Sequence, residues 1–239
     1  MKSIAFFRSM LIVMFMMPLL AHGQEKLRGK AIFFPTPMHE RNWLASFGVM
    51  TFATPAALTE QFRLNVPAGD IQLMRQVHGG FHLNARLLIQ ILQNHASIGP
   101  RWATELSKRW NFSVGTDLGW WKGHLDIEAF DTEATGWDAY PNFSFGYKAG
   151  RNVSLTFKTE AILKISYSTR VGRHEITRDI STYNGLAWSL YVEQPFFGRT
   201  HIALGFTARY TNFFWATWAL FNTHEKPLLF RQITIAFIP

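Results

Sequence analysis

The stretch "WNFSVGTDLGWW", residues 110–121, alternates between apolar and polar positions. Apolar side chains occupy every second place except Thr116: Trp110, Phe112, Val114, Leu118 and Trp120. The places between them hold small or polar residues: Asn111, Ser113, Gly115, Asp117 and Gly119. Successive side chains of a β-strand point to opposite faces, so a period of two indicates a strand with one apolar and one polar face. This stretch decides the fold class in favour of β structure.

The same alternation recurs along the chain. We predict strands near 43–53, 80–105, 109–121, 139–148, 152–166, 184–195, 200–212 and 228–238. Short connections at 107–108, 149–151 and 197–199 alternate with long ones at 54–79, 122–138, 167–183 and 213–227. Brief periplasmic turns and long outer loops alternate in this way in membrane barrels. The sequence therefore predicts an all-β, antiparallel up-and-down transmembrane β-barrel.

The number of strands depends on the segment 80–105. Its apolar phase changes near Gln93, from odd positions to even ones such as Ile98 and Trp102. A β-bulge there leaves one long strand and a total of eight, which is the even number that barrel closure requires. A turn there would split the segment, and a further strand would then be needed from 30–34 or 214–221. We prefer eight strands and keep ten open.

The amino terminus has the features of a secretory signal. Lys2 and Arg8 make a basic start, and the apolar run from Ser9 to Ala21 ends before Gly23. The run is too short for a membrane-spanning helix, which needs about 20 residues. We predict a signal peptide over 1–23, an irregular lead-in over 24–41 and the barrel over 42–239. The lead-in would be an extended periplasmic segment or an insert in the lumen.

Composition excludes several classes of function. The chain has no cysteine, which excludes a disulfide framework, thiol catalysis and cysteine metal sites. Only 17% of its residues are charged, against about 25% in a typical soluble domain. The formal net charge of +8 is spread over turns and loops, so we expect no nucleic-acid partner. Contact with anionic lipid is a more modest use of this charge.

A secreted β-sandwich is the main alternative to a membrane barrel, because it also contains alternating strands. The polar face of a sandwich meets water, so it should carry many charges and few glycines. Here the polar face holds small residues with isolated charges of both signs, which suits a narrow lumen where charges pair. We therefore predict a side-chain-filled polar lumen whose charged network is Arg86, Asp117, Lys158, Glu160, Lys164, Glu193 and Arg209.

Lipid would then cover the apolar face. Membrane barrels carry aromatic residues in girdles at both interfaces, near the ends of their strands. Six aromatic residues are predicted to be lipid-facing, several of them in such girdles: Trp43, Trp110, Trp120, Tyr147, Trp188 and Tyr210.

From residue 41 to 239 the chain resembles the small bacterial outer-membrane β-barrel proteins. The resemblance rests on the signal segment, the alternating strands, the unequal connections and a last strand that ends in Phe237-Ile238-Pro239. It implies an outer-membrane location after cleavage near Gly23, contact with lipid and lipopolysaccharide, and handling by the barrel-assembly machinery. That machinery often recognises a terminal aromatic residue, which here stands third from the end. The architecture hosts several functions and does not settle the activity.

Some barrels of this kind modify lipid A with a histidine and a serine. The candidates here are His95, His174 and His201, with Ser181 and Ser189, and none has a spacing recognisable for nucleophilic catalysis. We expect no catalytic residue, no metal site and no cofactor. Three functions remain: a non-enzymatic barrel with a structural or interaction role, a narrow pore for small solutes or ions, and a lipid A-modifying enzyme. The first leads, because side chains usually fill so narrow a lumen.

Overall fold

A computed structural model describes residues 30–37, 43–59, 65–127, 130–150, 152–172, 174–176, 181–197, 199–220 and 226–239. The predicted signal peptide lies outside the described residues. Within these ranges, ten strands form the barrel: β1 (Trp43–Ala53), β2 (Asn65–His78), β3 (Phe81–Ile89), β4 (Gln93–Glu105), β5 (Trp110–Ile127), β6 (Phe130–Lys148), β7 (Ser154–Val171), β9 (Tyr183–Phe197), β10 (Thr200–Thr211) and β11 (Leu228–Ile238).

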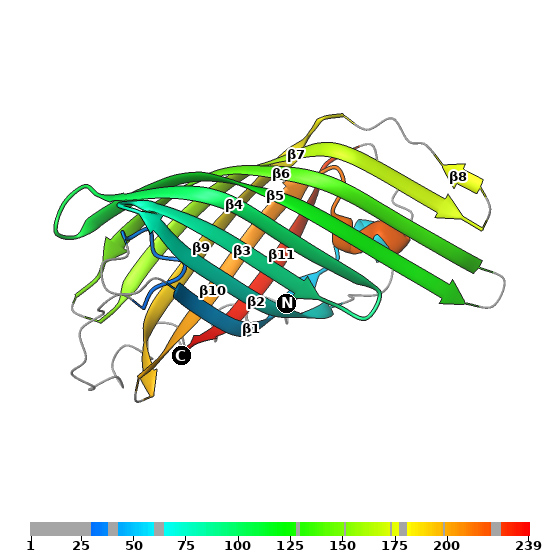
Figure 1. The fold of residues 1–239 in the computed structure, drawn as a ribbon. Helices are drawn as coiled ribbons and strands as arrows, with labels where there is room; N and C mark the ends of the chain where they lie inside the picture. Colours follow the sequence, from blue (N-terminus) through cyan, green and yellow to red (C-terminus); the bar gives the residue numbers. More distant parts are fainter. Residues whose placement is uncertain are drawn as a thin grey trace.

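The sheet closes on itself, and every pairing in it is antiparallel. Consecutive strands of the barrel are neighbours, β1 pairs with β11, and β6 pairs with β7. The short strand β8 (His174–Ile176) pairs with the end of β7 outside the barrel. Figure 1 shows the tilted strands, with β5, β6 and β7 extending furthest at the end that carries α2 (Ala56–Thr59) and η1 (Trp215–Leu220). Among the described residues, neither helix is long and apolar enough to cross a membrane.

The preferred count of eight strands was wrong, and the alternative of ten was right. A turn at 90–92 splits the predicted strand 80–105 into β3 and β4, and the Gln90 N–H donates to the Gln93 carbonyl across it at 3.0 Å. Odd positions therefore face outward in β3 and even positions in β4. The other added strand is β2, inside the predicted long loop 54–79, and not the segments 30–34 or 214–221.

The outer connections are also shorter than predicted. β5 and β6 continue to residues 127 and 130, so most of the predicted loop 122–138 belongs to a strand hairpin. β7 likewise continues to Val171, inside the predicted connection 167–183. The long hairpin projects beyond the rest of the barrel (Figure 1).

The outer surface of the barrel is apolar on every strand. In β1, for example, Trp43, Phe47 and Val49 are each more than half exposed. All ten barrel strands carry exposed large hydrophobic side chains, here together called the apolar belt. Soluble proteins rarely expose apolar patches larger than a few hundred Å². A closed barrel satisfies its backbone hydrogen bonds between strands, so lipid can cover this belt.

Two segments of the chain occupy the lumen. Residues 30–34, here called the amino-terminal insert, bury Ile32 and Phe33 in a cluster with Leu44, Met74, Tyr191, Ala203, Ala236 and Ile238. Residues 213–218, here called the aromatic plug, contribute Phe214, Trp215 and Trp218 to a second cluster with Met50, Phe52, Leu88, Trp121 and Phe230. The insert and η1 lie toward opposite ends of the barrel (Figure 1). Residues 30–34 belong to the lead-in predicted over 24–41, of which residues 24–29 and 38–41 lie outside the described residues.

Candidate functional site

A polar cavity of about 90 Å³ lies in the lumen between the insert and the plug. We call it the lumen chamber. Ile32 and Phe33 of the insert line it, and so do Phe214 and Trp215 of the plug. Its polar lining is Gln72, Asn84, Arg86, His95, Ser97, Arg101, Asp117, Tyr140, Lys158, Glu160, Arg209 and Gln232. A cavity of this size has room for roughly six water molecules or one small solute.

Glu193 fixes the amino-terminal insert. Its carboxylate accepts hydrogen bonds from the backbone N–H groups of Ile32 at 2.8 Å, Phe33 at 3.1 Å and Phe34 at 2.7 Å. The Phe33 ring stacks on Tyr191 with centroids 4.1 Å apart. Glu193 was predicted as a member of the charged lumen network, and the structure places it under the insert instead of in the chamber lining.

Side chains of the wall hold the aromatic plug. The Asn184 side chain donates to the Phe213 carbonyl at 2.7 Å and accepts from the Phe213 N–H at 2.9 Å. Gln93 donates to the Ala216 carbonyl at 2.8 Å. The Trp215 ring stacks on His95 with centroids 4.9 Å apart. A segment predicted as part of an outer loop therefore packs into the lumen.

Lys164 lies beside the plug. Its ammonium nitrogen is 3.9 Å from the ring centroid of Phe213 and 4.9 Å from that of Tyr167. Stacking of a cation on aromatic faces is attractive, more so where water is excluded. Lys164 is thus buried on the lumen side, although it is not one of the residues that line the chamber.

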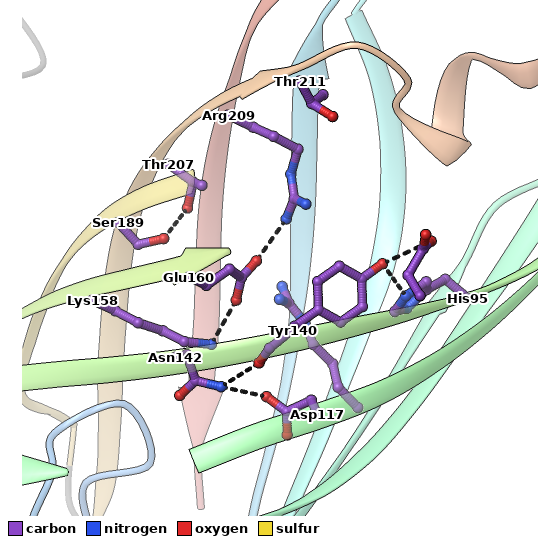
Figure 2. Close-up of polar contacts among 12 residues, drawn as sticks. His95, Asp117, Tyr140, Asn142, Lys158, Glu160, Ser189, Thr207, Arg209 and Thr211 are labelled. Carbon is purple, nitrogen blue, oxygen red and sulfur yellow. Dashed lines mark hydrogen bonds and ion pairs between the residues drawn. The ribbon is translucent and has the colours of Figure 1, made fainter. Parts of the chain in front are cut away.

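The other predicted charges line the chamber and most of them pair. Glu160 accepts from Arg209 at 3.0 Å and bonds Lys158 at 2.9 Å, as Figure 2 shows. Arg86 makes two hydrogen bonds to the carboxylate of Asp70, at 2.7 and 2.9 Å. These pairs join β7 to β10 and β2 to β3. Pairing offsets the cost of removing charges from water.

The prediction of a charged network missed its neutral members. Asn142 donates to Asp117 at 3.2 Å, and the Tyr140 hydroxyl lies 3.2 Å from the ring nitrogen Nε2 of His95 (Figure 2). The same hydroxyl donates to Asp138 at 3.2 Å. A Cβ at Gly119 would lie 2.7 Å from both the histidine and the tyrosine, so glycine permits this contact. The apolar residues of β6 fall on odd positions and face outward, so the even positions Tyr140 and Asn142 could have been predicted to face the lumen.

The candidate catalytic residues do not converge. The ring of His201 bonds the Lys30 carbonyl at 3.2 Å, and His174 is exposed on β8. The Ser189 hydroxyl shares a 2.8 Å hydrogen bond with Thr207, and Ser181 is exposed before β9. Each of these serines and histidines thus sits in a separate setting.

The six predicted lipid-facing aromatic residues lie on outward positions of the strands. Five are more than a third exposed: Trp43, Trp110, Trp120, Trp188 and Tyr210. Tyr147 is less exposed because its ring centroid lies 4.7 Å from that of Trp110. The assignment of particular residues to girdles stays a prediction, as does the functional role of the lumen charges.

No family model and no curated protein matches the sequence. Among solved structures, the KdgM porin is similar at 6% identity and a TM-score of 0.39, over 81% of this chain and 97% of that one. Ail, the attachment invasion locus protein of Yersinia pestis, has 8% identity and a TM-score of 0.39, over 82% and 95%. The translocator domain of the autotransporter NalP from Neisseria meningitidis has 5% identity and a TM-score of 0.44, over 84% and 88%.

At such low sequence identity, the similarity to these solved structures assigns no function to this chain. The architecture follows from the geometry of the chain itself. It combines an even number of antiparallel strands, a closed sheet, an apolar exterior and a polar interior. A closed ten-stranded barrel with these two faces has the architecture of a small bacterial outer-membrane β-barrel protein.

Proposed function

We propose that this chain is a non-enzymatic outer-membrane barrel with a structural or interaction role, whose lumen is closed to solute flow in this conformation. The observation that carries the proposal is that the barrel's own chain occupies the lumen on both sides of the chamber. The amino-terminal insert packs on Tyr191 on one side, and the aromatic plug packs on Phe52 and Phe230 on the other. A barrel occupied in this way acts through its exterior and its loops.

The plug is a close-packed part of the core. The Trp218 ring fills the space where a side chain at Gly123 would lie. Trp121, which is fully buried, packs against Phe213 with ring centroids 5.7 Å apart. Burial of a large aromatic side chain contributes about 2–3 kcal/mol. The closed state is therefore supported by the hydrophobic effect as well as by hydrogen bonds.

The projecting hairpin offers a surface for the interaction role. Beyond the cross-strand pair Trp120 and Trp137, both Lys122 and Arg170 form ion pairs with Glu133. The hydrogen bond from Lys122, together with the two cationic charges, lowers the pKa of Glu133, so this carboxylate is ionised at neutral pH. The hairpin also carries Asp126 and Asp131, so its carboxylates outnumber its cations and the surface that it offers to a partner is acidic.

Several parts of this proposal concern partners and location. The chain would reach the outer membrane after cleavage of a signal peptide near Gly23 and would be inserted by the barrel-assembly machinery. Lipid would contact the apolar belt, and lipopolysaccharide the outer ends of the strands. Contact with lipid is supported by the belt.

Conductance in planar bilayers tests the closed lumen. The wild type should show no stable channel steps. A triple variant Phe214→Ala, Trp215→Ala and Trp218→Ala should conduct, because the aromatic rings that fill the outer end of the lumen are removed. Trp188→Ala, on the outer face of β9, is the matched control and should stay closed. Stable steps from the wild type would contradict the proposal.

A narrow pore gated by the plug is the second candidate function. It is favoured by the chamber, which is already lined with charges of both signs. In that case the wild type would open intermittently, and the triple variant would remain open. Lipid A modification gains no such support, because His95 contacts Tyr140 inside the lumen and Ser189 bonds Thr207.

A further inference from the structure

We propose that the lumen chamber binds one small oxyanion, held by Arg101 and Asn84. The inference deepens the proposed function and rests on it, because it assumes a chamber bounded by the insert and the plug. The ligand class is defined by its chemistry: a carboxylate, sulfate or phosphate group small enough for a cavity of about 90 Å³. Three features of the chamber support it.

The first feature is a surplus of hydrogen-bond donors. Arg101 Nε, Asn84 Nδ2 and Arg209 Nε are buried and have no acceptor within the described part of the chain. All three residues line the chamber. A buried donor left without a partner costs about 1–3 kcal/mol. An occupant with several acceptor oxygens would remove that cost.

Acceptors are not in similar surplus. Of the described chamber-lining residues, the only other one with an unpartnered buried polar side-chain atom is His95, whose Nδ1 accepts or donates according to its tautomer. The wall thus offers donors to a ligand in the chamber.

The second feature is charge. Arg86 pairs with Asp70, whereas Lys158 and Arg209 share Glu160. Arg101 takes part in none of the ion pairs among the described residues. The remaining chamber carboxylate, Asp117, accepts a hydrogen bond from Asn142.

The cations of the chamber are Arg86, Arg101, Lys158 and Arg209, and the carboxylates near them include Asp70, Asp117, Glu160 and Glu193. Glu193, below the insert, has its carboxylate occupied by three backbone N–H groups. Among the described residues, Arg101 is therefore the chamber cation that has no carboxylate at ion-pair distance, and an oxyanion in the chamber would supply one.

The third feature is the geometry of the donors. Across the β3–β4 pair, Asn84 lies opposite Gly99 and His82 lies opposite Arg101. Asn84 and Arg101 are therefore on adjacent strands, offset by two residues along the strand. A guanidinium group presents parallel N–H bonds that match the oxygens of a carboxylate or phosphate. Asn84 adds a neutral donor beside it.

Equilibrium dialysis of the purified full chain in a non-ionic detergent tests the proposal, because it tolerates slow entry into a closed chamber. Radiolabelled acetate, sulfate and phosphate are the probes. Each is used in a separate experiment, so that the results show which of the three oxyanions binds. The same concentration of chloride keeps the ionic strength constant in every arm. The wild type should retain about one equivalent of one probe, and Arg101→Gln should weaken retention by about tenfold or more.

Two further variants keep the test decisive if Arg101→Gln fails to fold. Asn84→Asp keeps Arg101 and places a negative charge in the chamber, so it should abolish retention. Lys108→Gln removes a cation from the exposed turn between β4 and β5 and should bind as the wild type does. Heat-dependent gel mobility verifies that each variant is folded. Absence of retention of all three probes by the wild type, or equal retention by the folded Arg101 and Asn84 variants, would overturn the proposal.

The bilayer experiment separates this inference from the proposed function. If the wild type forms open channels but retains a probe in a way that depends on Arg101, the proposal of a closed lumen is wrong and the oxyanion site stands. If the wild type stays closed and retains no probe, the closed barrel stands, the oxyanion site is wrong, and the chamber holds water alone.

Discussion

Glu193 is a buried carboxylate whose partners are backbone groups of a distant segment instead of a cation. Its three hydrogen bonds to the amino-terminal insert span about 160 positions of sequence, with separations of 159 to 161. An ionised acceptor forms stronger hydrogen bonds than a neutral one, about 1.5–3 kcal/mol each. One residue thus makes three of the hydrogen bonds that hold the insert in the lumen.

Replacement Glu193→Gln should release the insert, because an amide has one acceptor oxygen and places an N–H₂ group against backbone donors. Trypsin cleavage after Lys30 should rise by about tenfold or more, as a loss of 1.4 kcal/mol gives a factor of ten. Mass spectrometry of the folded protein after brief digestion measures the rate. Glu175→Gln, on the exposed strand β8, should leave it unchanged. Equal cleavage of the two variants would show that the carboxylate does not hold the insert.

At the scale of elements, the close packing of β5, β6 and the plug depends on glycine. A Cβ at Gly136 would lie 2.8 Å from the Trp121 ring, which itself packs on Tyr167 and Phe213. Gly136→Ala should therefore lower the free energy of unfolding by about 1–3 kcal/mol, the usual cost of overpacking.

Urea titration in detergent measures this free energy. Gly69→Ala is the matched control, since its Cβ would meet only Ile89, at 3.9 Å, and the variant should match the wild type. A Gly136→Ala protein as stable as Gly69→Ala would mean that the Trp121 ring can move without disturbing the plug.

Elements with one apolar face were predicted from sequence, and elements without one were not. In β5 the outward residues Trp110 and Trp120 fall on the predicted face. In β2, by contrast, Gly69 faces outward while Ala68 and Met74 face the interior. Alternation is therefore weak in β2, and the strand was mistaken for a loop.

The candidate site was predicted in part for a related reason. Inward charges such as Arg86 and Glu160 interrupt apolar strands and are visible in the sequence. The insert and the plug have no period, because their residues pack on the interior of a barrel instead of belonging to its sheet. Which charges pair was also beyond the sequence, since Asp70 lies on the missed strand and it is Asp70 that pairs with Arg86.

At the scale of the whole molecule, the apolar belt distinguishes a membrane barrel from a water-soluble one. Leu118 lies at an outward position in the middle of β5 and is 43% exposed. In lipid, an arginine near the midplane of a barrel costs about 2–4 kcal/mol. In water, the same replacement would remove an exposed apolar side chain and cost little.

Leu118→Arg should therefore reduce the fraction of the chain that folds into lipid vesicles and should lower the urea midpoint of the folded remainder. Leu106→Arg makes the same replacement in the exposed turn between β4 and β5 and is the control, which should fold as the wild type does. The folded fraction is read from the gel mobility of unheated samples, since closed membrane barrels commonly resist detergent until heated. If Leu118→Arg folds as well as Leu106→Arg, the belt does not face lipid, and the barrel would have to bury its apolar exterior against another protein.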